Sequence, residues 1–136
     1  MIPLTQTVAG LLSGIIILIP AARADETRAT NAKARLHAAR KVYHGMLERA
    51  KIDPNSPLDP DKLCHWSRRW LEAERDLGET KEARIAAVQG HLERMKTMDV
   101  LVKQLFEQKL VTPVDVAAQA FFRLEAERDL AQAKGK

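Results

Sequence analysis

Four histidines and a single cysteine are among the side chains of this chain that could ligate a transition metal. His37 and His44 are seven residues apart, which on a helix places them two turns, about 10 Å, apart on one face. One ion cannot bridge that distance. Cys64 and His65 are adjacent, so on a helix they point about 100° apart. Neither His-Glu-x-x-His nor Cys-x-x-Cys occurs, and we therefore predict no metal site and no cofactor.

Carboxylates could also do chemistry, and four glutamates lie in the two copies of the heptapeptide Leu-Glu-Ala-Glu-Arg-Asp-Leu, at residues 71–77 and 124–130. A di-iron site in a helical bundle takes a histidine three residues after a ligating glutamate. Arg75 and Arg128 stand at those positions, and glutamate–arginine pairs at this spacing are ordinary ion pairs on a helix surface. The chain also has no nucleophile beside a base and no glycine-rich phosphate loop. We therefore predict no catalytic residues and no enzyme.

The segment Trp66-Ser67-Arg68-Arg69-Trp70 gathers two aromatic rings and two cations within one helical turn. It could form a cation–π surface for a protein partner or an anionic polymer. Alternatively, the two rings cover the open end of a helical hairpin while the arginines extend outward. We favour the second interpretation, because both tryptophans fall on the apolar stripe of the predicted helix.

The N-terminal segment predicts where in the cell the protein is located. Residues 7–22 are almost wholly apolar and lead into Ala22-Arg23-Ala24, which is typical of a signal peptide cleaved after Ala24. The alternative is an uncleaved anchor, although the run is shorter than the roughly 20 residues of a spanning helix. We expect a signal peptide at 1–24, an exported domain at 25–136, and a periplasmic or extracellular location. Membrane contact is expected only through an uncleaved segment.

Charge and cysteine content argue against nucleic acid as a partner and against an internal disulfide. The whole chain carries +4, and losing Arg23 with the signal peptide leaves +3. Bases and acids alternate along the same helices, and aromatic residues make up only 4% of the chain, so we expect no nucleic-acid binding. Cys64 is the only cysteine, which excludes an internal disulfide. It is either a buried thiol, which we favour, or a route to a covalent dimer.

Helix signals divide the exported domain into three segments. Apolar residues step by three and four from residue 27 to about 52, where a cluster of aspartates and prolines ends the pattern. Asp59 and Pro60 then mark a helix start, and the pattern continues to about residue 109 if Gly78 is absorbed at a cost of about 1 kcal/mol. Thr112 and Pro113 repeat the start signal. We expect helices at about 27–52, 60–109 and 113–134.

The predicted fold is all-α. A second pair of similar segments is present at Gly45 to Lys51 and at Gly90 to Lys96, one before each copy of the heptapeptide. This order indicates an internally duplicated chain. We expect the first and third helices to pack antiparallel on opposite halves of the long central one, as elongated coiled-coil hairpins. Such a thin rod leaves apolar surface that favours self-association.

The stretch from Leu105 to Gln119, running on through the second heptapeptide to Ala133, resembles the helical-hairpin segments of TolC-type outer-membrane efflux proteins. Those segments also place a short turn before a Ser/Thr-Pro cap, and that family is internally duplicated. The resemblance implies helical hairpins and, as one alternative, an accessory role in efflux. This chain departs from the family in its short length, in lacking strands for a barrel, and in having Lys109 or Leu110 where the family has a turn glycine. The mature chain also resembles small exported bacterial helical proteins.

We expect a non-enzymatic protein of the cell envelope whose partner is a second copy of itself or another coiled-coil protein. A periplasmic chaperone or stress sensor of the helical-cradle type is an alternative. The predicted interaction residues are the apolar stripe together with the two arginines of the tryptophan segment: Leu36, Tyr43, Leu63, Trp66, Arg68, Arg69, Trp70, Leu92, Met95, Phe121 and Leu124.

Overall fold

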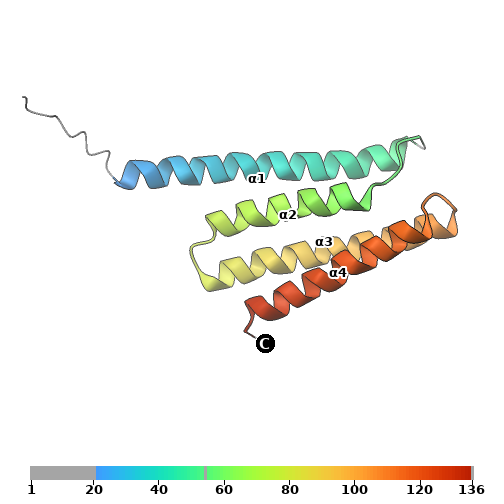
Figure 1. The fold of residues 1–136 in the computed structure, drawn as a ribbon. Coiled ribbons are helices and arrows are strands. Elements are labelled where there is room, and N and C mark those ends of the chain that lie inside the picture. The colour runs from blue at the N-terminus through green and yellow to red at the C-terminus, as the bar shows by residue number, and fades with distance from the viewer. Residues whose placement is uncertain (1–20, 54, 136) are drawn as a thin grey trace, which may run out of the picture.

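The computed structural model describes residues 21–53 and 55–135. They form four α-helices, namely α1 (Ala21–Ile52), α2 (Pro60–Leu77), α3 (Lys81–Glu107) and α4 (Pro113–Ala133). Successive helices run in opposite directions (Figure 1). α3 packs against α4, and α2 packs against both, whereas the packing of α1 is with α2. The predicted all-α class is confirmed, and within the described residues there is no strand.

The two proline-marked helix starts are confirmed. Asp59 accepts a hydrogen bond from the backbone N–H of Lys62 at 3.1 Å, and Pro60 is the first residue of α2. Thr112 caps α4 in the same way, and Asp115 completes a capping box by accepting from the backbone N–H of Thr112 at 2.8 Å. Each cap satisfies amide groups that have no partner within the first helical turn.

The predicted continuous helix over 60–109 is wrong, because the chain reverses between Leu77 and Lys81. Gly78 takes an extended conformation (φ −74°, ψ 111°) after the last turn of α2. Thr80 then caps α3, with its hydroxyl oxygen accepting from the backbone N–H of Ala83 at 3.1 Å. The bundle therefore has four helices rather than three, and the predicted pairing of two helices with opposite halves of one rod does not occur.

Packing explains why the reversal is favoured over a continuous rod. α2 and α3 bury apolar side chains in one common core, whereas a single rod would leave much of the same surface in water. Transfer of apolar surface from water contributes about 25 cal/mol per Å². The core is formed by residues of all four helices and of the loop before α2: Tyr43, Leu58, Leu63, Cys64, Leu71, Ala87, Val88, Leu92, Met95, Met98, Val102, Ala126 and Leu130.

The N-terminal prediction falls largely outside the described residues. α1 already begins at Ala21, earlier than the predicted start at residue 27. Residues 1–20, which hold most of the predicted signal peptide, are not described by the structure. Cleavage after Ala24 therefore stays a prediction.

The turn between α3 and α4 forces Lys109 into the left-handed region, with φ 59°. The N–H of Leu110 donates to the carbonyl of Leu105 at 2.9 Å, and that of Lys109 donates to Phe106 at 2.9 Å. These two bonds define a Schellman motif, in which glycine is the usual left-handed residue. Lys109 therefore adopts a conformation that disfavours its own Cβ.

Replacing Thr80 by alanine removes the cap of α3, so we expect the free energy of unfolding to fall by about 1 kcal/mol. Urea unfolding monitored by circular dichroism measures this change. Thr97→Ala is the matched control, because the Thr97 hydroxyl donates only to the carbonyl of Glu93 in the middle of α3. An equal loss in both variants would mean that the cap does not stabilise the reversal.

Replacing Lys109 by glycine relieves the left-handed strain, so we expect the free energy of unfolding to rise by about 1 kcal/mol. Gln108→Gly is the control, since Gln108 has an ordinary φ of −85° and gains only backbone entropy in the unfolded state. That variant should be less stable than the parent. A destabilised Lys109→Gly variant would contradict the assigned turn geometry.

Candidate functional site

The predicted interaction residues are divided between the core and the surface. Four are less than 5% exposed: Tyr43, Leu63, Leu92 and Met95. Four more are half-buried: Leu36, Trp66, Arg68 and Trp70. Three are exposed: Arg69, Phe121 and Leu124. Much of the apolar stripe is therefore the core of one chain, and only its α4 members keep large exposed apolar side chains.

Trp70 lies where three helices meet. The guanidinium of Arg94, from α3, is 3.9 Å from the centroid of its ring, and that of Arg40, from α1, is 5.0 Å away. The indole Nε1 donates to Glu74 Oε1 at 2.7 Å, and the same oxygen accepts from Arg40 Nη2 at 2.9 Å. The ring of Tyr43 packs edge-on at 5.9 Å. This cation–π cluster joins α1, α2 and α3.

The two arginines beside Trp70 in the sequence have other partners. Arg68 forms an ion pair with Glu125 of α4. Arg69 pairs with Glu72 on the surface of α2, at 3.0 Å. The predicted outward orientation therefore holds for Arg69 and is wrong for Arg68, which connects α2 to α4.

Cys64 is 3% exposed in the core beneath Arg68. Burial raises the pKa of its thiol, while the nearby Arg68 opposes the increase. The thiolate is the nucleophilic form of cysteine. A buried, protonated thiol agrees with the favoured interpretation and does not offer a surface disulfide.

A buried polar network joins α2 to α3, and it was not predicted from the sequence. Ser67 Oγ lies 2.7 Å from His91 Nδ1 and accepts a hydrogen bond from Arg94 Nε at 2.7 Å. Arg94 Nη2 also donates to the carbonyl of Ser67 at 3.2 Å. Both Ser67 and His91 are 0% exposed. The sequence feature that could have indicated this network is that Ser67 and His91 each occupy a core position in an otherwise apolar helical stripe.

The network holds His91 in its neutral form. Burial, together with the positive charges of Arg94 and Arg68, lowers the pKa of His91 to about 4. Burial also lowers the pKa of Arg94, to about 10, against the opposing charge of Glu74. Arg94 is therefore still a cation at neutral pH. A serine beside a neutral histidine resembles a catalytic pair, but both residues are fully buried, so Ser67 Oγ is not accessible to a substrate.

A second set of buried polar groups joins α3 to α4. Gln119 is 0% exposed, and its Nε2 donates to the carbonyl of Met95 at 2.9 Å. Asp99 is 7% exposed and pairs with Lys103 at 2.8 Å and with Arg123 at 3.4 Å. Buried polar groups without partners cost free energy, so these bonds restrict how the two helices can pack.

The opposite face of α4 carries apolar side chains that the described chain does not cover. Val114, Phe121 and Leu124 are 75%, 61% and 54% exposed, and Ala117 between them is also exposed. We call these four residues the α4 stripe. Their spacing of three, four and three residues is that of a coiled-coil seam, so the stripe can accept another helix.

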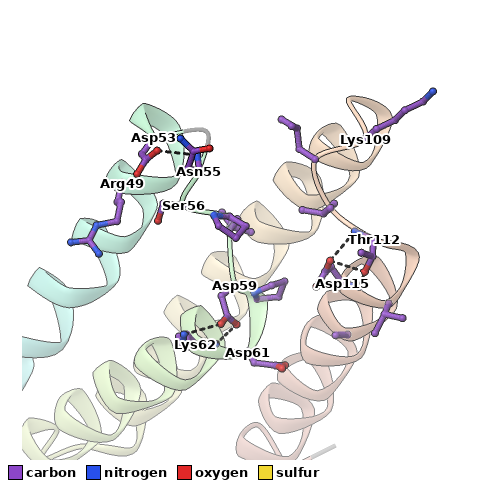
Figure 2. Close-up of a pocket in the computed structure, with 17 residues that line it drawn as sticks. Arg49, Asp53, Asn55, Ser56, Asp59, Asp61, Lys62, Lys109, Thr112 and Asp115 are labelled. Atoms are coloured by element: carbon purple, nitrogen blue, oxygen red, sulfur yellow. Dashed lines mark hydrogen bonds and ion pairs between the residues drawn. The ribbon is translucent and has the colours of Figure 1, made fainter.

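A cleft of about 930 Å³ lies at the end of the bundle where the α1–α2 and α3–α4 loops meet. Figure 2 shows Asp59 bonded to Lys62 at the start of α2, and Asp115 bonded to Thr112 at the start of α4. The hydrogen bonds from Thr112 lower the pKa of Asp115. These two carboxylates therefore accept the hydrogen bonds that cap their helices.

Metal-binding and membrane-spanning features are absent from the described ranges, 21–53 and 55–135. No group of three or more histidine, cysteine, aspartate or glutamate residues there could hold a metal ion. No helix of that part of the chain is long and apolar enough to cross a bilayer. His44, one of the residues weighed as a ligand, packs edge-on against Tyr43 and Trp70 instead.

Comparison with known proteins identifies no relative. No family model matches the chain, no curated protein is similar to it, and no solved structure matches it. The resemblance to efflux-protein hairpins therefore stays a prediction.

Acid should destabilise the fold through His91. Its pKa is about 4 when folded, against the ordinary value of 6.5, so above about pH 6.5 it is neutral in both states and adds no pH dependence. As the pH falls from about 6.5 towards 4, His91 takes up a proton in the unfolded chain but not in the folded one. We expect the free energy of unfolding to fall by up to about 3 kcal/mol between pH 6.5 and 4.

Urea unfolding of the parent and of His91→Asn across this pH range measures the effect. The variant should lose stability at neutral pH but show a smaller decrease on acidification, because the buried titrating group is gone. Identical slopes in the parent and in His91→Asn would rule out this role of His91.

Proposed function

We propose that this protein is a non-enzymatic helical interaction protein that pairs with a second copy of itself through the α4 stripe. The observation that carries this proposal is an apolar seam, exposed over three turns of α4, on a chain whose core is filled by other residues. Exposed apolar surface in a continuous row is a feature of interaction sites. We further propose that the protein acts at the cell envelope, as its N-terminal sequence predicts.

The order of large and small residues in the stripe favours a second copy as the partner. In an antiparallel pair centred on residue 119, Phe121 of each copy lies opposite Ala117 of the other, and Leu124 lies opposite Val114. Each bulky side chain thus faces a smaller one. Ala118 and Ala120 flank the seam and allow the helices to approach closely. A self-complementary patch of this kind produces a twofold dimer.

The repeated sequence supports the same use of this face. We propose that α1–α2 and α3–α4 are duplicated coiled-coil hairpins, with Pro60 and Pro113 at equivalent first positions. Residues 53 positions apart then correspond. The counterparts of Ala117 and Leu124 are Cys64 and Leu71, which are buried inside the bundle. Two of the four positions of the α4 stripe therefore correspond to positions that α2 uses for packing, whereas Val114 and Phe121 correspond to the exposed Asp61 and the half-buried Arg68.

Replacing Phe121 and Leu124 together by serine should abolish self-association. Because both side chains are exposed in the monomer, the variant should fold normally and unfold within about 1 kcal/mol of the parent. Size-exclusion chromatography with light scattering, over a roughly hundredfold dilution, measures the mass. The parent should change from dimer to monomer on dilution, since a single-helix seam is a small interface.

The matched control is Ile52→Ser with Val100→Ser, which removes two exposed apolar side chains, 78% and 56% exposed, from outside the stripe. This variant should associate like the parent. A parent that is monomeric at every concentration would remove the proposal, as would a Phe121→Ser/Leu124→Ser variant that still dimerises. Reductant should have no effect, because Cys64 is buried.

A further inference from the structure

Two adjoining hollows lie at the end of the bundle that holds the α2–α3 reversal. One, of about 450 Å³, is bounded by α2, α3 and α4. The other, of about 370 Å³, is bounded by Arg28 of α1 and by residues on both sides of Gly78. Arg75 and Arg84 line both hollows, and Lys81 lines the first. Four basic side chains from three helices therefore line the two hollows, which share Arg75 and Arg84 and which we call together the surface depression.

The acidic residues that line these hollows are already engaged. Glu72 pairs with Arg69 at 3.0 Å, Asp76 with Arg35 at 2.5 Å, and Asp129 with Arg128 at 2.9 Å. By contrast, the four bases make no ion pair with any residue of the described part of the chain: Arg28, Arg75, Lys81 and Arg84. Glu79 and Glu82 are nearby in sequence but do not line either hollow. The surface depression is therefore positive in charge.

Backbone groups add to this positive character. α3 has 27 residues and begins at Lys81, so the positive end of its helix dipole lies beside the hollow that Lys81 lines. Arg84 Nε donates to the carbonyl of Gly78 at 3.2 Å, which fixes the arginine beside the loop. Its two terminal nitrogens make no hydrogen bond within the described ranges, and a guanidinium can bind two oxygens of one phosphate group.

The floor of the larger hollow is apolar. It contains Leu71 and Val88, which are 7% and 6% exposed, and the half-buried Ile85. A basic rim above an apolar floor suits an anion that carries a hydrocarbon part close to its charge.

We propose that this depression binds a phosphate group, with Arg75 and Arg84 as its principal contacts and Lys81 and Arg28 as additional cations. The phosphate can belong to an anionic phospholipid headgroup or to a small soluble molecule. The proposal is independent of dimer formation, because the site lies at the reversal end of the bundle and uses no residue of the α4 stripe.

The test compares two double variants with equal loss of charge. Arg75→Gln with Lys81→Gln removes two bases from the site, and both side chains are exposed. Arg49→Gln with Lys109→Gln removes two bases that line the cleft at the other end of the bundle. Titration calorimetry with inorganic phosphate, and co-sedimentation with phosphatidylglycerol or phosphatidylcholine vesicles, are run at about 0.15 M salt to screen long-range attraction.

We expect saturable binding that is weakened at least about tenfold in Arg75→Gln/Lys81→Gln and by less than about twofold in the control variant. Phosphate binding together with phosphatidylglycerol binding, both lost in the site variant, identifies the headgroup as a source. Phosphate binding without vesicle binding identifies a soluble ligand. No saturable binding to either probe, or equal weakening in both variants, would overturn the proposal. Circular dichroism melting confirms that both variants fold.

Discussion

The reversal between Leu77 and Lys81 is the constraint on which the rest of the bundle depends. Because α2 ends there, α3 returns along it, and Ser67 comes within 2.7 Å of His91 although 24 residues separate them in the sequence. The same reversal brings Arg94 over the ring of Trp70. The hydrophobic core needs only that apolar faces meet. The buried polar network needs one register of α2 against α3, because a shift would leave Ser67, His91 and Arg94 without partners.

The sequence predicted the helix starts at Pro60 and Pro113 correctly because two independent signals coincide at each: a capping side chain and a proline at the first helical position. It did not predict the break at Gly78. One glycine costs about 1 kcal/mol in a helix, and a cap at Thr80 contributes a similar amount. No proline lies between Leu77 and Lys81 to end the helix. Tertiary packing decides such a balanced case. The local sequence therefore could not distinguish three helices from four.

The predicted interaction residues show a similar division. Period and hydrophobicity correctly indicated an apolar row, but they do not tell whether that row faces its own chain or another. In α4 the ambiguity is greatest, because apolar residues occur on every side. Ala126 and Leu130 pack into the core, while Phe121 and Leu124 face outward. The cations that pack on Trp70 could not be found from the sequence, because Arg40 and Arg94 are distant from it along the chain and only the fold brings them to the ring.

α1 is the longest helix, with 32 residues, yet its packing is with α2. α2 in turn packs against α3 and α4, which follow it in the chain. α1 therefore packs on a helix whose other side is covered by α3 and α4. In the finished protein, α1 is also the helix with the fewest neighbours to release when the structure opens locally.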